Sequence, residues 1–170
     1  RGKQVTELMW LLYRLSAQAR VAGGHVHYVL GNHEVMMMAG DVRYTARKYH
    51  AVARAFGLPT EGIVGPDTEI GRWWRSLDSM IRIGPYLFVH GGVSLALGGR
   101  PLDIVKLNEA LRSVFGIPPQ AIKSRQLQAL AWGRQGPFWY RGYFAAHARH
   151  FGPAPTVDEM DTILRNLGAK

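Results

Sequence analysis

The stretch Val29-Leu30-Gly31-Asn32-His33-Glu34 decides how the rest of the chain is interpreted. Its apolar start continues a run of β-branched and aromatic residues that follows a Gly-Gly break, so the sequence predicts a buried strand over residues 26–30. Glycine ends this strand, and the chain from Glu34 onward is predicted to be helical. Ligands of open α/β sheets bind where strands turn into helices, so Asn32 and His33 stand where a site is expected.

A second apolar segment ends in the same way. Residues 79–83 and 86–90 flank Gly84-Pro85, a pair that favours a tight turn, so they predict a β-hairpin. The hairpin runs into His90-Gly91-Gly92, again a ligand-capable side chain followed by glycine. Either short motif alone is weak evidence. Both together, each after an apolar strand, indicate a site built from strand ends.

These two motifs resemble two signatures of the calcineurin-like metallophosphatases. Within that superfamily, residues 4–7, 31–36, 67–73 and 139–143 look most like the Shewanella-like protein phosphatases, bacterial-type relatives of the serine/threonine phosphoprotein phosphatases. The resemblance covers nearly the whole chain. It implies an α/β fold, a layered metallophosphatase-like β-sandwich flanked by helices. Residues 1–170 would then be the central part of a single metallophosphatase domain.

The resemblance also implies a set of site residues. Asn32 and His90 would be ligands in a centre of two divalent metal ions, for which Mn, Fe and Zn are suited to such donors. His33 would be the general acid that protonates the leaving group. Arg1 and Arg141 would grip the phosphate, because a planar guanidinium binds it through two parallel hydrogen bonds.

The family pattern is incomplete at both ends of the sequence. The Asp-x-His motif, the aspartates that precede Arg1-Gly2 in the second motif and the final Gly-His motif are absent, and with them the carboxylate that would hold His33 protonated. Asn32 and His90 alone cannot hold two ions. We therefore expect residues 1–170 by themselves to be inactive, unless His147 and His150, neither of which follows a glycine, complete the site.

The predicted function is metal-dependent hydrolysis of phosphate monoesters by a protein phosphatase, acting on phosphoserine, phosphothreonine or phosphotyrosine. One alternative is a metallophosphoesterase acting on a nucleotide or another small phosphate ester. Another is a non-catalytic anion-binding domain on a decayed phosphatase scaffold. Two site residues also have structural alternatives: Asn32 could cap the following helix, and Arg141 could stack on Trp139 and Tyr143.

The amino-acid composition limits the classes of binding partner and the kinds of site. The formal charge of +9 and the pI near 10.3 favour an anionic partner, such as a phosphorylated substrate, nucleic acid or a membrane surface. The arginines are scattered and are not interleaved with aromatics, so no specific nucleic-acid site is predicted. The absence of cysteine excludes disulfides and thiolate ligands. No apolar run approaches the length of a membrane span, and the compartment (cytoplasmic or periplasmic) and the oligomeric state are left open.

Helices account for most of the remaining sequence. Their predicted ranges are residues 3–22, 41–56, 102–115 and 121–131, a short helix from Asp67 as N-cap, and a tail helix opened by a Thr156–Glu159 capping box. The methionine run after Glu34 is predicted to fill core gaps. His25, His27 and His50 are predicted to have no role in the site.

Overall fold

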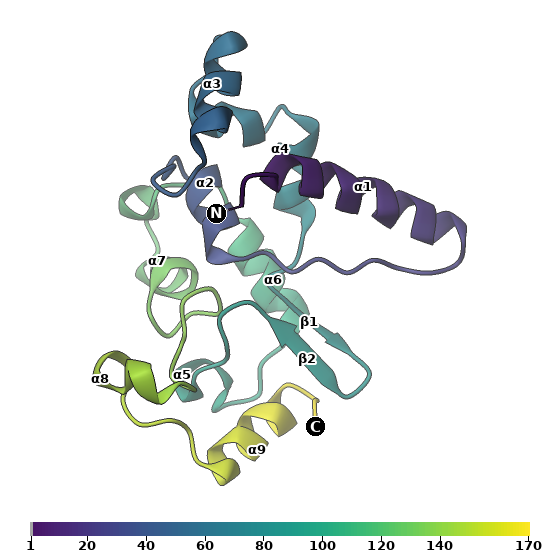
Figure 1. The fold of residues 1–170 in the computed structure, drawn as a ribbon. Coiled ribbons are helices and arrows are strands. Elements are labelled where there is room, and N and C mark those ends of the chain that lie inside the picture. Colours follow the sequence, from purple (N-terminus) through teal and green to yellow (C-terminus); the bar gives the residue numbers. More distant parts are fainter. Residues whose placement is uncertain (1) are drawn as a thin grey trace.

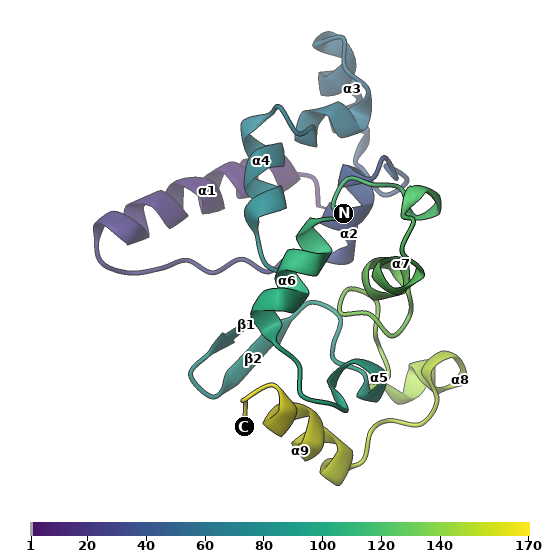
Figure 2. The same cartoon turned by 180° about the vertical axis from the view of Figure 1, so that it is seen from behind.

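The structure is a computed structural model that describes residues 2–170, shown from opposite sides in Figures 1 and 2. Its α-helices are α1 (Val5–Val21), α2 (Asn32–Met38), α3 (Arg47–Ala55), α4 (Glu69–Ser76), α5 (Leu95–Gly98), α6 (Ile104–Arg112), α7 (Arg125–Trp132), α8 (Ala148–Phe151) and α9 (Val157–Asn166). Short 3-10 turns are η1 (Thr60–Val64), η2 (Pro119–Ala121) and η3 (Ala145–His147). The strands are β1 (Met80–Ile83) and β2 (Tyr86–Val89). The described chain is thus a helix-rich α/β arrangement.

The predicted hairpin is confirmed. Strands β1 and β2 pair antiparallel, with Met80 opposite Val89 and Ile83 opposite Tyr86, and Gly84 takes a φ of +58° in the turn. A positive φ is cheap only for glycine, so this residue sets the tight connection. Within residues 2–170 the sheet has these two strands, and the layered β-sandwich is not confirmed.

The prediction of a strand over residues 26–30 is wrong. The segment runs extended from the end of α1 back to α2 (Figure 1), but it pairs only at one parallel bridge, between Val29 and Asp78. The Leu30 amide donates to the Asp78 carbonyl at 3.0 Å. A strand needs a partner along its length, and the rest of the described chain offers this segment backbone at that one point.

Two polar side chains of α6, Asn108 and Arg112, hold the start of β1. The buried Asn108 side chain accepts hydrogen bonds from the amides of Ser79 (2.9 Å) and Met80 (3.2 Å) and donates to the Met80 carbonyl at 2.8 Å. One turn later Arg112 forms an ion pair with Asp78. The backbone carbonyl of Asp78 accepts the hydrogen bond from Leu30. Helix α6 therefore holds both the segment before α2 and the start of β1.

The hydrophobic core lies directly behind those segments. Leu30, Met80 and Phe138 are completely buried although they are far apart in the sequence, and Leu111 of α6 is buried among them. Leu30 is two residues before Asn32, Met80 pairs with Val89 next to His90, and Phe138 is three residues before Arg141. The core therefore fixes the depth at which the site loops emerge.

Several helix boundaries differ from those predicted. Helix α2 begins at Asn32 and not at Glu34, and the predicted helix over residues 41–56 is helical only in α3, after a non-helical loop. Asp67 is not the N-cap of α4; Thr68 is, and its side chain accepts from the Gly71 amide at 3.0 Å. The Thr156–Glu159 capping box at the start of α9 is confirmed.

Helix α1 buries little of its apolar face. Met9 is the residue of this helix that is buried, whereas Leu8, Trp10 and Leu11 are each about half exposed. The hairpin likewise exposes Tyr86 and Phe88. Within residues 2–170 no element covers these side chains. No described helix is long and apolar enough to cross a lipid bilayer.

We predict that Asn108→Ala lowers the free energy of unfolding by about 2–4 kcal/mol, because two amides and a carbonyl at the buried start of β1 lose their partner. Urea unfolding followed by far-UV circular dichroism measures this loss. Glu109→Ala, on the exposed side of the same helix, is the matched control and should change stability by less than about 0.5 kcal/mol. Equal effects of the two variants would contradict the anchoring role of Asn108.

Candidate active site

The first part of the site is the turn into α2. Gly31 is its N-cap, in an extended conformation, and its amide donates to the Glu34 carboxylate at 2.8 Å. Because Glu34 closes the first turn in this way, Asn32 is already helical and the helix starts two residues before the predicted position. The alternative in which Asn32 caps α2 is not observed. Its side chain is instead available to a distant residue.

That residue is His90, which directly follows β2. Its Nε2 atom lies 3.0 Å from Asn32 Oδ1, so two residues 58 positions apart meet side chain to side chain. The imidazole also packs on the backbone of Gly31, where a Cβ would lie 2.9 Å from His90 Nδ1. A side chain at position 31 would therefore displace the ring, which is the physical reason for a glycine there.

Arg141 completes the cluster from the loop after α7. Its guanidinium donates to the Tyr140 carbonyl at 2.8 Å, and its Nη2 lies 3.3 Å from His90 Nε2. Partial burial lowers the pKa of Arg141, which still carries its charge at neutral pH. Burial lowers the pKa of His90, and the neighbouring guanidinium lowers it further, so the neutral imidazole is favoured.

The loop that carries Arg141 packs against the backbone of Gly91 and Gly92, which have no side chains. The Gly91 amide donates to the Pro137 carbonyl at 2.7 Å, and a Cβ at Gly91 would lie only 2.4 Å from that oxygen. At Gly92, with φ +143°, a Cβ would lie 2.7 Å from the Tyr143 ring. The Tyr143 hydroxyl then accepts from the Val93 amide at 2.8 Å and donates to the Val93 carbonyl at 2.6 Å. The two glycines are thus what brings Arg141 to His90.

His33 lies in different surroundings, facing the loop before α3. Its ring makes an edge-on contact with Tyr44, with centroids 4.9 Å apart. The nearby Asp41 carboxylate accepts hydrogen bonds from Arg43 at 2.7 and 2.8 Å, which lowers the pKa of Asp41, and the charge of His33 lowers it further. Asp41 and protonated His33 therefore stabilise each other. No periodicity or motif in the sequence indicates a role for Asp41 or Tyr44.

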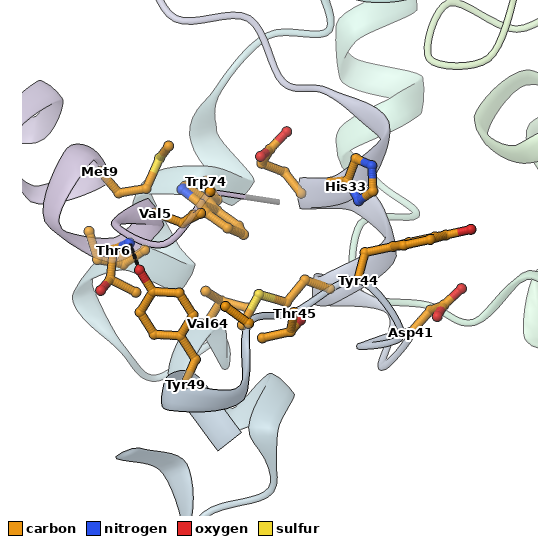
Figure 3. Close-up of a pocket in the computed structure, with 15 residues that line it drawn as sticks. Val5, Thr6, Met9, His33, Asp41, Tyr44, Thr45, Tyr49, Val64 and Trp74 are labelled. Carbon is orange, nitrogen blue, oxygen red and sulfur yellow. Dashed lines mark hydrogen bonds between the residues drawn. The ribbon is translucent and has the colours of Figure 1, made fainter. Parts of the chain in front are cut away.

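A partly open, mainly apolar cavity of about 50 Å³ is bordered by His33. Figure 3 shows His33 and Tyr44 on one side of it and Trp74 and Tyr49 on the other. The Tyr49 hydroxyl accepts from the Thr6 amide at 3.2 Å, so this wall ties α3 to α1. A cavity that holds benzene measures about 150 Å³, so this one is too small for an aromatic ligand.

Comparisons with known proteins found similar solved structures and one similar sequence. The structure superposes on that of a cold-active protein tyrosine phosphatase from a psychrophilic Shewanella species with a TM-score of 0.87 and 38% identity, over 99% of this chain and 49% of that one. Another structure described as a cold-active protein tyrosine phosphatase gives a TM-score of 0.88 and 37% identity, over 99% of this chain and 48% of that one. Shewanella-like protein phosphatase 2 of Arabidopsis thaliana is 38% identical over 48 residues, 28% of this chain and 12% of that protein. No family model matches.

The chain is similar to the Shewanella-like protein phosphatases. The resemblance inferred from its motifs is thereby confirmed. The chain spans about half the length of the solved phosphatases that it matches and about an eighth of the curated one.

The remaining predicted residues lie as follows. Arg1 lies outside the described residues. Among residues 2–170, no group of three or more histidine, aspartate and glutamate side chains is arranged to hold a metal ion. His147 contacts Phe144 and Phe151, and His150 contacts Arg149, so the contacts of both stay within their own segment. Residues 25, 27 and 50 show no link to the site: His25 stacks on His27, and His50 bonds Thr60 at 2.7 Å.

We predict that Gly91→Ala destabilises this phosphatase relative by about 1–3 kcal/mol, the usual effect of overpacking, because the new methyl group meets the Pro137 carbonyl. Urea unfolding is the measurement. Gly24→Ala serves as the control, since a Cβ there makes only an ordinary contact at 3.7 Å. If both variants were equally stable, the close docking of the Arg141 loop would be disproved.

Proposed function

We propose that the intact protein containing this sequence hydrolyses phosphate monoesters on protein side chains, with phosphotyrosine as the favoured substrate. The observation that carries the proposal is the convergence of Asn32 Oδ1 and the Arg141 guanidinium on the same nitrogen of His90, at 3.0 and 3.3 Å. The protein tyrosine phosphatases that share this fold at 37–38% identity support the substrate class.

We further propose that Asn32 and His90 contribute to a centre of two divalent metal ions, of which Mn, Fe and Zn are the candidates. An amide oxygen and a neutral imidazole nitrogen are donors that such ions accept. The Asn32 and His90 donor atoms lie 3.0 Å apart, so both would be able to reach the same ion. Bound metal would supply charge neutralisation and a water of lowered pKa. The remaining ligands would come from residues other than these.

The other side chains have separate tasks in this proposal. Arg141 is rigidly held with one edge towards His90, so it can bind phosphoryl oxygens through charge-assisted hydrogen bonds. His33 is next to Asn32 in the first turn of α2 and would donate a proton to the leaving oxygen. The carboxylate of Asp41 favours the protonated imidazole that this step needs. Arg1 remains a second proposed phosphate ligand.

We predict that His33→Asn lowers turnover by about 10²- to 10⁴-fold while bound metal is retained, because the variant loses a proton donor but no ligand. Hydrolysis of p-nitrophenyl phosphate and elemental analysis measure the two quantities. Both require the intact protein, since Asn32 and His90 alone are too few ligands for residues 1–170 to be active. His27→Asn, at an exposed histidine, is the control. Unchanged turnover would remove His33 from the mechanism.

His90→Ala and Arg141→Ala should give opposite phenotypes. The first deletes a proposed ligand and should lose metal. The second should keep metal and raise the inhibition constant for free phosphate by about 10- to 100-fold, the effect of losing hydrogen bonds to a charged group. Arg54→Ala, on the exposed face of α3, controls for the general loss of positive charge. An unaltered inhibition constant in Arg141→Ala would favour a structural arginine.

A further inference from the structure

A second hollow also borders His33 and shares Asp41 and Tyr44 with the small cavity. It is an open groove of about 470 Å³, which we call the aryl groove. Its lining consists of Asn32, His33, Met36, Asp41, Arg43, Tyr44, Pro119, Trp132 and Trp139. Asn32 and His33 belong to the proposed reaction centre, so the groove is continuous with the place where a phosphate would react. Its volume is well above the 150 Å³ or so that surrounds a benzene ring.

The aromatic walls of the groove are held in place. The Trp139 indole donates to the Ala131 carbonyl at 2.9 Å and stacks on Trp132, with centroids 5.9 Å apart and planes inclined by 28°. Tyr44, also in the lining, lies edge-on to His33 and is 46% exposed. Fixed aromatic rings lose little conformational freedom when a ligand binds, so such walls favour another flat ring.

In the lining of the groove, Asp41 and Arg43 offset each other's charge in an ion pair at 2.7 Å, and the remaining titratable side chains are His33 and Tyr44. The anionic phosphate is therefore drawn towards Arg141 near His90, and the middle of the groove suits a neutral group. A neutral, flat group attached to a phosphate is an aryl ester.

We infer that the aryl groove receives the aromatic ring of an aryl phosphate, and that Tyr44 and Trp139 determine the preference for phosphotyrosine over phosphoserine. The inference rests on the proposed phosphatase function and adds to it the residues that choose the substrate. A phosphoserine side chain has no ring to contact these walls, so both variants below should affect it little. Each lost aromatic contact should weaken use of the aryl substrate by about 2- to 10-fold.

The test compares kcat/KM for two peptides of identical sequence that carry either phosphotyrosine or phosphoserine. In the intact protein, Tyr44→Ala and Trp139→Leu should each lower the phosphotyrosine to phosphoserine ratio by about 2- to 10-fold. Tyr86→Ala, at an exposed tyrosine on the hairpin, should leave the ratio unchanged. A ratio that is unchanged in Tyr44→Ala would overturn the inference. Because Tyr44 is exposed, that variant decides the matter even where Trp139→Leu fails to fold.

A binding measurement separates this inference from the proposed function. Calorimetry compares phenylphosphonate with methylphosphonate, which share the anionic group and differ in the ring. If the wild-type protein hydrolyses neither peptide, the phosphatase proposal fails. The groove then stands only if phenylphosphonate binds more tightly than methylphosphonate and Tyr44→Ala removes the difference. Equal binding of the two compounds by the wild-type protein would overturn it.

Discussion

The site depends on one backbone contact, the hydrogen bond of 2.7 Å from the Gly91 amide to the Pro137 carbonyl. It forms because positions 91 and 92 carry no side chains, which lets the loop that follows α7 lie against the loop that follows β2. The hydroxyl of Tyr143 then fastens the same two loops at Val93. Without this approach Arg141 would have no fixed relation to His90. The proposed phosphate-binding arginine and the proposed metal ligand would then lie on separate surfaces.

The close docking also has an electrostatic consequence. It partly buries His90 and brings the positive charge of Arg141 near the ring, so that both effects keep the imidazole neutral. His33, the proposed proton donor, interacts differently with its surroundings, since its charge and the carboxylate of Asp41 attract each other. Two histidines that serve the same proposed reaction thus have opposite electrostatic surroundings. Environments that push titratable groups apart are how neighbouring side chains take separate roles in one site.

The parts of the fold that the sequence predicted depend on contacts within a few residues. The capping box of α9 joins residues three positions apart, and the hairpin follows from two short apolar runs around Gly84. The prediction of a strand over residues 26–30 was wrong because a strand needs a pairing partner, which the local sequence pattern does not specify. The N-cap of α4 is Thr68 and not the predicted Asp67. Local sequence rules separate these two residues poorly, because both side chains are good N-caps.

The sequence by itself determined which side chains were proposed for the site: Asn32, His90 and Arg141 were named by their motifs, and the structure brings these three together. Only the tertiary structure decided what surrounds them. The contact of Tyr44 with His33, the charge of Asp41 and the Trp132–Trp139 wall come from segments with no motif in common. Such contacts depend on how loops and helices distant in sequence pack on one core, and no periodicity or spacing along the chain encodes that packing.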